Sequence, residues 1–570
     1  MRINNAGINM LLNLPLLAAA SLWLGGAAAS PDVVKDADNV RQVAIIGAGA
    51  AGSSAAYYLR NFADEHGVAV NITVFEKTDR IGGRTLTVNP FGNSSQRVEL
   101  GASIFIKKNH IMYQALGEFG LEPRDPDVGS DPELGIWDGE RFVFQINEDH
   151  SFWWNAYKVV MKYGFLAPRR TQKLMEATID KFLQLYEAPF FPFRSLTQRT
   201  YELGLVEVTG VTGEQLLKKN SVGDLYAHDI VQASTRVNYA SNLAKIHGLD
   251  TMVSMAPEGA MAVKGGNWRI FDTMVKRSGA HVALNTSAVS IGFAPEQASR
   301  LPRYIIGTES SGEKAENPVV FDNVILANPL QFSKIEAADG VIHNAIDEIP
   351  YVQLHVTIFA SPFRYSPAFF GLTDPKDVPG TILTTLGADD TPESGAGKAG
   401  FFSISTLRKV FNPESEQEEY LYKIFSPERV TSEFLSRLFG VEVPDSITFE
   451  KKGDDTRISP ISWYYPTVFH SYPKALPRVT FQDPIIGPGL YYTSGMESFI
   501  STMETNALMG KNVARLIIDD ALGVRSGYSV SGDDDSDRGE ALKITCDRGK
   551  GQGQLEVPKT RPTEPAMADL

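Results

Sequence analysis

The chain has 570 residues, of which 43% are hydrophobic and 10% aromatic, which is typical of a globular protein with room for two or more domains. Its formal net charge of −14 argues against a nucleic-acid partner, because DNA and RNA are bound by clusters of Lys and Arg. With one cysteine, Cys546, and nine histidines that lack ligand spacing, we expect no intrachain disulfide, no iron–sulfur cluster and no metal site.

Residues 1–29 have the character of a secretory signal peptide. Arg2 precedes an interrupted apolar stretch from Met10 to Leu24, and small residues up to Ala29 provide a cleavage motif. An uncleaved N-terminal anchor is the alternative. We therefore expect the secretory pathway, with the protein ending in a lysosome or vacuole or outside the cell.

Three Asn-x-Ser/Thr tripeptides agree with that route. Asn93 lies in a loop rich in Pro, Gly and Ser and is the preferred glycosylation acceptor. Asn71 opens an expected strand and Asn285 falls within another, so these two are weaker candidates.

A glycine-rich turn follows the first apolar run after residue 40. Val43 to Ile46 reads as a buried strand, and Gly47, Gly49, Ala51 and Gly52 then form a Gly-x-Gly-x-x-Gly pattern at the start of a helical run. Glycines let the backbone approach a pyrophosphate, and a helix N-terminus offers it free N–H groups. The turn predicts a dinucleotide site, with an ordinary glycine turn as the structural alternative.

The next strand narrows the choice of dinucleotide. Ile72 to Phe75 reads as a strand, and it is followed by Glu76 and Lys77, with Glu76 placed 24 residues after Gly52. A carboxylate at this position can accept hydrogen bonds from ribose hydroxyls and would repel a 2′-phosphate. We place Glu76 and Lys77 in the cofactor site and favour FAD or NAD over NADP.

A second glycine-rich segment, Arg80-Ile-Gly82-Gly83-Arg84-Thr85, arrives a few residues later. Its paired glycines allow a second backbone segment to pass the cofactor, and its arginines can neutralise a pyrophosphate. The segment resembles the Arg-x-Gly-Gly-Arg motif of FAD-dependent amine oxidases, phytoene desaturases and their relatives. That resemblance makes FAD the expected cofactor and places Gly83 and Arg84 beside it, with a basic glycine-rich loop as the structural alternative.

The expected fold class is α/β, with a discontinuous Rossmann-like FAD-binding domain and a mixed α+β substrate domain. Strands are expected at 281–291 and 321–327, a strand and turn at 489–495, and a helix at 502–519. We assign 41–105, 255–335 and 481–522 to the FAD-binding domain and 106–254 and 336–480 to the substrate domain. Residues 524–570 are polar and are expected to form a disordered tail.

The first segment assigned to the substrate domain, residues 106–254 (the first insert), is rich in aromatic residues between Phe152 and Phe193. Core or helix packing is the structural reading of such a stretch. An apolar substrate pocket or a membrane-facing entrance is the functional reading, and the second of these implies a peripheral membrane contact.

Four further segments carry a closer resemblance. They are Glu99 to Phe105, Lys264 to Asn267, Phe469 to Pro473, and Gly495 to Ala507. In this order and spacing they resemble the prenylcysteine oxidase family, also called the prenylcysteine lyase family, over about residues 41–520. The resemblance implies an FAD-dependent thioether oxidase that cleaves farnesylcysteine or geranylgeranylcysteine with O2 and water. The products would be cysteine, a prenyl aldehyde and hydrogen peroxide, formed in the breakdown of prenylated proteins.

The resemblance also implies roles for single residues. Gly101, Ala102 and Ser103 are expected beside the flavin ring, and Val289 along the adenine. Gly495, Thr502 and Met503 are expected where a helix N-terminus faces the flavin N1/C2 carbonyl. No catalytic group is identified; the candidates are His470, as the base that activates water, and Glu497. Glu497 and Glu504 have the alternative roles of binding ribityl hydroxyls or capping a helix N-terminus.

Two other functions stay open at this point. An amine or polyamine oxidase of the same fold would need acidic or aromatic groups for a substrate amine, whereas a prenyl group needs a long apolar tunnel. The aromatic insert favours the prenyl substrate. A lipid-carrying module that has lost catalysis is the third alternative, although the intact glycine and Glu76 pattern argues that FAD binding is retained.

Overall fold

The computed structural model describes residues 40–127, 133–146, 152–256, 259–295, 302–316, 319–447 and 458–524. The expected signal peptide, the expected tail and Cys546 lie outside these ranges. No helix in the described ranges combines the length and the apolar character that crossing a bilayer requires.

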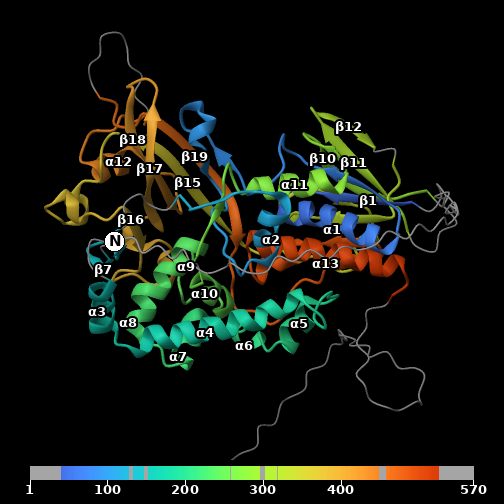
Figure 1. Ribbon diagram of the computed structural model, residues 1–570, viewed down its shortest axis with the longest axis horizontal. Coiled ribbons are helices and arrows are strands. Elements are labelled where there is room, and N and C mark those ends of the chain that lie inside the picture. Colours follow the sequence, from blue (N-terminus) through green and yellow to red (C-terminus); the bar gives the residue numbers. More distant parts are fainter. Residues whose placement is uncertain are drawn as a thin grey trace, which may run out of the picture. The chain divides into compact units, whose positions relative to one another are not determined.

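Three separate stretches of the chain build one mainly parallel sheet (Figure 1). Its order is β20-β21-β13-β1-β2-β9, and five of the strands are parallel, in the doubly wound arrangement of dinucleotide-binding folds. Apolar runs suit these strands because helices and loops cover both faces of the sheet. The strands are β1 (Arg41–Ile46), β2 (Val70–Phe75), β9 (His281–Ala283), β13 (Asn323–Leu326), β20 (Ile485–Gly487) and β21 (Leu490–Tyr492).

The helices α1 (Ala50–His66) and α13 (Met503–Ala521) lie against each other beside this sheet (Figure 1). A Cβ on Gly510 would lie 2.1 Å from the carbonyl oxygen of Ala51, so the two backbones touch. The helix that we expected at 502–519 is therefore confirmed. It is buried around most of its surface, because α1 and the helices α2 (His110–Phe119) and α11 (Trp268–Ser278) join the same core.

The expected single strand at 281–291 is wrong. Asn285 has a φ of +51°, which ends β9 and turns the chain into a separate strand, β10, in another sheet. Asn285 is thus an exposed turn residue, and the reason for ranking it below Asn93 disappears. The second sheet has the order β12-β11-β10-β14 and consists of β10 (Ser287–Phe293), β11 (Tyr304–Ser310), β12 (Glu313–Glu316) and β14 (Glu336–Ala337).

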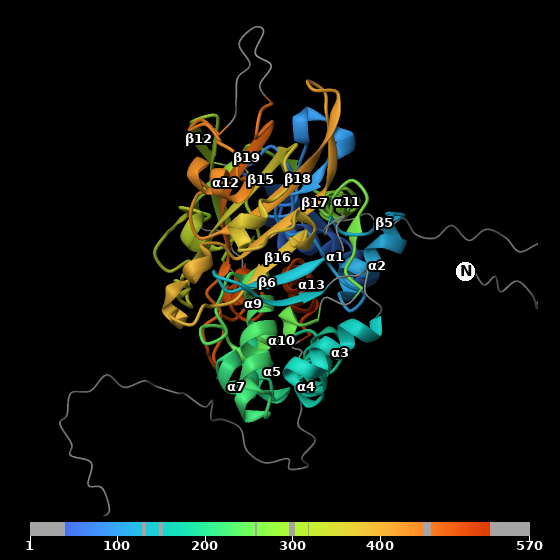
Figure 2. The ribbon, with the colours of Figure 1, turned by 90° about the vertical axis from the view of Figure 1, so that its left-hand side faces the viewer.

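A seven-stranded, mostly antiparallel sheet and a layer of helices make up most of the rest of the described chain (Figure 2). One face packs on α12 (Ser432–Phe439) through an aromatic core. The other face packs on the hairpin of β3 (Thr87–Val88) and β4 (Val98–Glu99). The strands are, in order across the sheet, β19 (Trp463–Pro473), β15 (Tyr351–Ser361), β18 (Gln417–Ser426), β17 (Ser403–Asn412), β16 (Thr381–Thr384), β6 (Leu134–Trp137) and β7 (Phe142–Ile146).

The helical layer comes from the first insert (Figure 2). Phe182, Tyr186 and Phe193 are buried in the core that contains α1 and α13, so these aromatic residues have the structural role. The helices are α3 (Phe152–Tyr163), α4 (Leu166–Leu183), α5 (Leu196–Glu202), α6 (Val206–Thr209), α7 (Gly213–Lys219), α8 (Asp224–Tyr226), α9 (Gln232–Tyr239) and α10 (Gly248–Ser254). A short pair, β5 (Pro123–Arg124) and β8 (Ala262–Val263), joins the insert to the next segment.

Candidate active site

The glycine turn after β1 forms a cradle at the carboxyl edge of the parallel sheet. Gly47 has a φ of +105°, and a Cβ on Gly52 would lie 1.9 Å from the Gly47 carbonyl oxygen, so the turn itself requires both glycines. Gly49 is different: its φ is −76°, and a Cβ there would meet nothing closer than the Gly83 Cα at 3.9 Å. The fold alone therefore does not require glycine at position 49. The open space beside Gly49 fits the close approach of a ligand.

The start of α1 faces that space. Within the part of the chain that the structure describes, no side chain caps the helix N-terminus at Gly49, and Ala51 lies in the first turn. Free N–H groups at a helix N-terminus attract phosphate oxygens. The residues present therefore fit a dinucleotide pyrophosphate.

Glu76 lies beside the same turn. Its Oε2 accepts a hydrogen bond from the Ala48 N–H at 2.8 Å, and its Oε1 accepts from the N–H and hydroxyl of Thr78 at 2.9 and 2.8 Å. The carboxylate is buried and held in place, and Oε2, which accepts one hydrogen bond, keeps a further lone pair for a ribose hydroxyl. Lys77 points outward as an exposed residue.

The second glycine segment lies directly on the first. The Gly82 N–H donates to the Ala48 carbonyl at 2.9 Å, and a Cβ on Gly83 would lie 3.0 Å from the Gly49 Cα. Arg80 donates to the Gly83 carbonyl at 2.8 Å and so holds its own loop. The two glycine-rich segments are therefore in direct backbone contact, which the sequence only suggested.

Arg84 and Glu497 form a two-pronged ion pair. Nη1 of Arg84 lies 2.8 Å from Oε2 of Glu497, and Nη2 lies 2.7 Å from Oε1. Arg84 also donates to the Ser471 carbonyl, and the Tyr351 hydroxyl donates to Glu497. Glu497 is buried and committed to these partners, which makes it a residue that positions the Gly495 segment.

The Arg84 backbone contacts the segment Gly101 to Ser103. A Cβ on Gly101 would lie 1.9 Å from the Arg84 carbonyl oxygen, and the Ala102 N–H donates to that oxygen at 3.3 Å. Ser103 donates to the Gly101 carbonyl at 2.9 Å. The Arg84 backbone and the Gly101 segment thus form one continuous surface.

A buried lysine that the sequence analysis missed supports this segment. Nζ of Lys423, on β18, donates to the Glu99 carbonyl and to the Ser103 hydroxyl, both at 3.0 Å. Burial lowers the pKa of Lys423 to about 8, against the opposing charges of Glu99 and Asp127. The available signal was a lysine inside the apolar run Leu421 to Phe425, because a charged residue in a buried strand is rare.

Glu99 connects two of the family-like segments. Its Oε1 accepts the Asn267 N–H at 2.7 Å, while its Oε2 has no partner among the described residues. The Asn267 amide also donates to the Ala102 carbonyl at 3.3 Å. Burial raises the pKa of Glu99 to about 7, although the Asn267 hydrogen bond and Lys423 oppose this.

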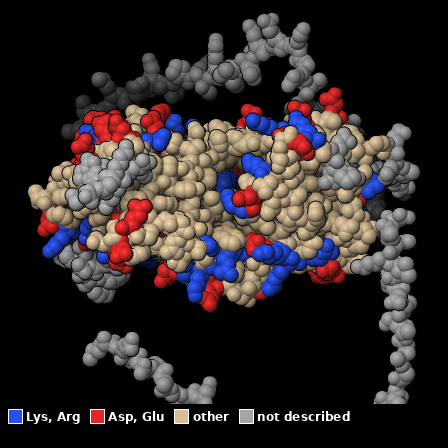
Figure 3. Space-filling view, turned by 90° about the horizontal axis from the view of Figure 1, so that it is seen from above, with Lys and Arg blue, Asp and Glu red and all other residues tan. Residues whose placement is uncertain are grey.

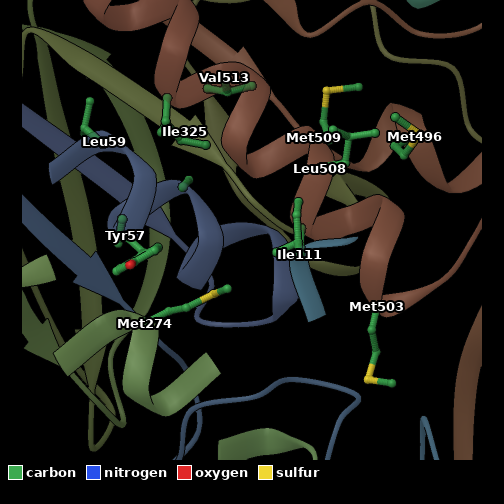
Figure 4. Close-up of a cluster of buried hydrophobic side chains, with 14 of the residues drawn as sticks. Tyr57, Leu59, Ile111, Met274, Ile325, Met496, Met503, Leu508, Met509 and Val513 are labelled. Carbon is green, nitrogen blue, oxygen red and sulfur yellow. The ribbon is translucent and has the colours of Figure 1, made fainter. Parts of the chain in front are cut away.

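The N-terminus of α13 is capped internally. The Thr502 hydroxyl accepts the Thr505 N–H at 3.1 Å, and the Thr505 hydroxyl accepts the Thr502 N–H at 3.1 Å, forming a capping box. The side chain of Met503 lies apart from those of Leu508 and Met509 (Figure 4). Gly495 begins the preceding turn, where a Cβ would lie 2.5 Å from the Gln482 carbonyl oxygen.

Glu504 has the capping role that the sequence left open. Its Oε1 and Oε2 accept hydrogen bonds from the N–H groups of Ile111 and Met112, at 2.8 and 2.9 Å. These two residues are at the start of α2. Burial raises the pKa of Glu504 to about 7, opposed by these two hydrogen bonds. Glu504 therefore joins α13 to α2.

Two further candidates lie on the strands β19 and β10. His470 is an exposed residue of β19 and stacks on Phe332, with ring centroids 4.2 Å apart. Val289 occupies a bulge between β10 and β11, where the register shifts and its backbone lies outside the regular pairing. Asn71, Asn93 and Asn285 are all exposed.

One face of the molecule is hollowed near its centre, and basic and acidic side chains gather at the rim of the hollow (Figure 3). Within the described ranges, no cluster of His, Cys, Asp and Glu side chains is arranged to hold a metal ion.

The fold and the cradle define a dinucleotide-binding protein with the architecture of two-domain amine oxidases. A solved variant of putrescine oxidase matches with a TM-score of 0.51 and 15% identity, covering 84% of this chain and 99% of that one. Cyclohexylamine oxidase from Brevibacterium oxydans matches with a TM-score of 0.50, 15% identity and the same coverage. Residues 45–119 match the family described as NAD(P)-binding Rossmann-like domain.

Residues 146–525 match the family described as prenylcysteine lyase, and the chain belongs to that family. Farnesylcysteine lyase of Arabidopsis thaliana is 28% identical over 499 residues, which cover 84% of this chain and 89% of the relative. Prenylcysteine oxidase 1 of Bos taurus is 27% identical over 518 residues, covering 89% and 92% respectively.

Proposed function

We propose that this protein is an FAD-dependent thioether oxidase that cleaves prenylcysteines. The substrates are farnesylcysteine and geranylgeranylcysteine, and O2 and water are consumed to give cysteine, a prenyl aldehyde and hydrogen peroxide. One observation carries the proposal: family-like segments far apart in sequence are bonded to one another through Glu99 and Asn267 and through Arg84 and Glu497. This convergence supports a single site that includes these segments and lies next to the glycine cradle.

The chain's own residues bind and orient. Gly47, Gly49 and Gly52 with the start of α1 would hold the pyrophosphate, and Glu76 would hold the ribose. When bound, FAD supplies the two-electron oxidation of the carbon next to sulfur, and O2 takes up those electrons. Gly101 to Ser103, fixed by Arg84, Lys423 and Asn267, would provide the rigid surface against which the reacting carbon is placed.

The decisive experiment compares substrates on the purified, FAD-loaded protein. Farnesylcysteine should bleach the flavin spectrum under anaerobic conditions and release hydrogen peroxide in air, while spermine and benzylamine should do neither. Release of peroxide from the amines alone would replace the proposal with an amine oxidase. A preparation that holds FAD but is reduced by neither class would contradict both.

We also propose that the protein follows the secretory pathway and is glycosylated. The apolar leader-like residues and the exposed Asn93 support this, and the equally exposed Asn71 and Asn285 are further acceptors. Expression in a eukaryotic host should give a protein whose gel mobility rises on enzymatic removal of N-glycans. Asn93→Gln should remove part of that shift, and an unchanged mobility in all cases would contradict the proposal.

A further inference from the structure

The helix α3 and the first turns of α4 are basic and apolar in a chain that is otherwise acidic. Residues 152–175 contain five Lys or Arg and no Asp or Glu, whereas the whole chain has a net charge of −14. Both helices lie at the margin of the helical layer in two perpendicular views (Figures 1 and 2). Helices that lie flat in a membrane interface have this composition.

The described side chains of α3 divide into two faces. Val159 and Tyr163 face inward, where Tyr163 contacts Phe144 of β7 with ring centroids 5.6 Å apart and donates to Asp229 at 3.0 Å. The outward residues of α3 follow helical spacing, with exposed fractions of 51% for Tyr157, 42% for Val160 and 67% for Met161. Phe165 and Leu166 come after the turn at Gly164, at the start of α4, and are 60% and 56% exposed.

Cations accompany this exposed apolar face. Arg169 and Lys173 are exposed on α4, Lys158 is half-buried on α3, and the Arg169 guanidinium lies 5.9 Å from the Phe165 ring centre. Lys162 is held by Asp229 at 2.7 Å. Basic groups therefore lie beside the exposed apolar side chains on both helices, and the first acid along α4 is Glu176, three residues after Lys173.

We propose that this face, defined by Tyr157, Val160, Met161, Phe165 and Leu166 with Lys158, Arg169 and Lys173, docks on an anionic lipid surface. Apolar side chains enter the headgroup region while Lys and Arg meet the lipid phosphates. A second copy of the chain fits less well, since a symmetric contact would bring Lys158, Arg169 and Lys173 of one copy close to the same cations of the other. The docking does not depend on the reaction; only its benefit, access to prenyl compounds dissolved in the membrane, rests on the proposed function.

Vesicle flotation of the full-length, FAD-loaded protein tests this surface. The wild type should float with phosphatidylcholine vesicles that contain phosphatidylserine, and less so as salt is raised. Met161→Glu/Phe165→Glu should weaken the binding by about tenfold or more. Lys158→Gln/Lys173→Gln should weaken it on phosphatidylserine vesicles and leave any binding to phosphatidylcholine unchanged.

Tyr201→Glu is the matched control, because Tyr201 is 75% exposed on α5 and lies outside the docking face. It should float like the wild type. The proposal is overturned if the wild type does not float, or if Tyr201→Glu weakens binding as much as the double glutamate variant. It is also overturned if sedimentation shows a wild-type dimer that Met161→Glu/Phe165→Glu converts to monomer, because the face would then be a protein interface.

Discussion

Arg84 and Glu497 are bound by two parallel hydrogen bonds of 2.8 and 2.7 Å although 413 residues separate them. The pair ties the second glycine segment to the turn before α13, and the Ser471 carbonyl and Tyr351 hydroxyl complete the contact from β19 and β15. The second glycine segment, the antiparallel sheet and the turn before α13 thus meet at one ion pair.

Breaking this pair from one side should destabilise the protein. Arg84→Met leaves the buried Glu497 without its cation, and we expect a loss of about 1–3 kcal/mol in the free energy of unfolding. The loss should fall below that of a fully buried pair because the Arg84 side chain is 36% exposed. Arg84→Met/Glu497→Gln should lose less than the sum of the two single variants in urea unfolding of the FAD-loaded protein. Additive losses would contradict the coupling.

Gly49→Ala should separate cofactor binding from folding. Its Cβ would make ordinary contacts and its φ suits any residue, so the unfolding free energy of the FAD-free protein should change by less than about 0.5 kcal/mol. The methyl group would occupy the cradle, and the FAD affinity should fall by about tenfold or more, measured by flavin fluorescence.

Two other glycines act as controls for that variant. Gly117→Ala, inside α2 with open space around its Cβ, should leave the FAD affinity near the wild-type value and raise the unfolding free energy by about 0.5–1 kcal/mol. Gly52→Ala should lower both the FAD affinity and the unfolding free energy, since its Cβ would lie 1.9 Å from the Gly47 carbonyl oxygen. Normal FAD affinity in Gly49→Ala would show that the cofactor does not approach this turn.

Lys423 should act as a positioning residue for the reaction. It holds Ser103 and Glu99, and its cation lies behind the segment that we expect at the flavin ring. A nearby cation favours the negative charge that collects on reduction, so Lys423→Met should lower kcat at neutral pH by about tenfold. Since the pKa of Lys423 is about 8, wild-type kcat should fall as the pH rises past that value, because the cation is lost.

The pH profile distinguishes this role from a purely structural one. In Lys423→Met the decline in kcat near pH 8 should be absent. Lys409→Met, which removes an exposed lysine from the neighbouring strand β17, should keep the wild-type profile. If Lys423→Met and the wild type lose kcat in parallel above that pH, the lysine charge has no part in the reaction.

Short-range sequence patterns were sufficient to predict the glycine cradle but not the side-chain contacts that support the segments around it. Gly47 to Gly52, Glu76 and the helix at 502–519 follow from short-range rules of turns, strands and helical periodicity. The contacts of Lys423 with Ser103 and of Arg84 with Glu497 span hundreds of residues, and one chain without its fold carries no signal for such pairings. The misplaced strand at 281–291 has a different cause, because the left-handed turn at Asn285 interrupts an otherwise strand-like pattern.

Glu99→Gln should remove one source of pH-dependent stability. Burial raises the pKa of Glu99 to about 7 in the folded protein, whereas an unfolded glutamate titrates near about 4.3. Between these values the folded state binds more protons than the unfolded state, so stability falls as the pH rises. The contribution of protonated Glu99 to the stability of the folded protein is fully present below about pH 4 and is lost above about pH 7.

The variant keeps an acceptor for the Asn267 N–H and cannot ionise. The unfolding free energy of the variant minus that of the wild type should therefore rise between about pH 5 and pH 8, by on the order of 1–3 kcal/mol in urea titrations, because only the wild type loses stability over this range. Glu504, whose pKa is also raised to about 7, contributes the same slope to both proteins and cancels in the difference. Parallel curves for the two proteins across this range would mean that Glu99 does not take up a proton on folding, and that Lys423 and the Asn267 N–H hold it ionised in place.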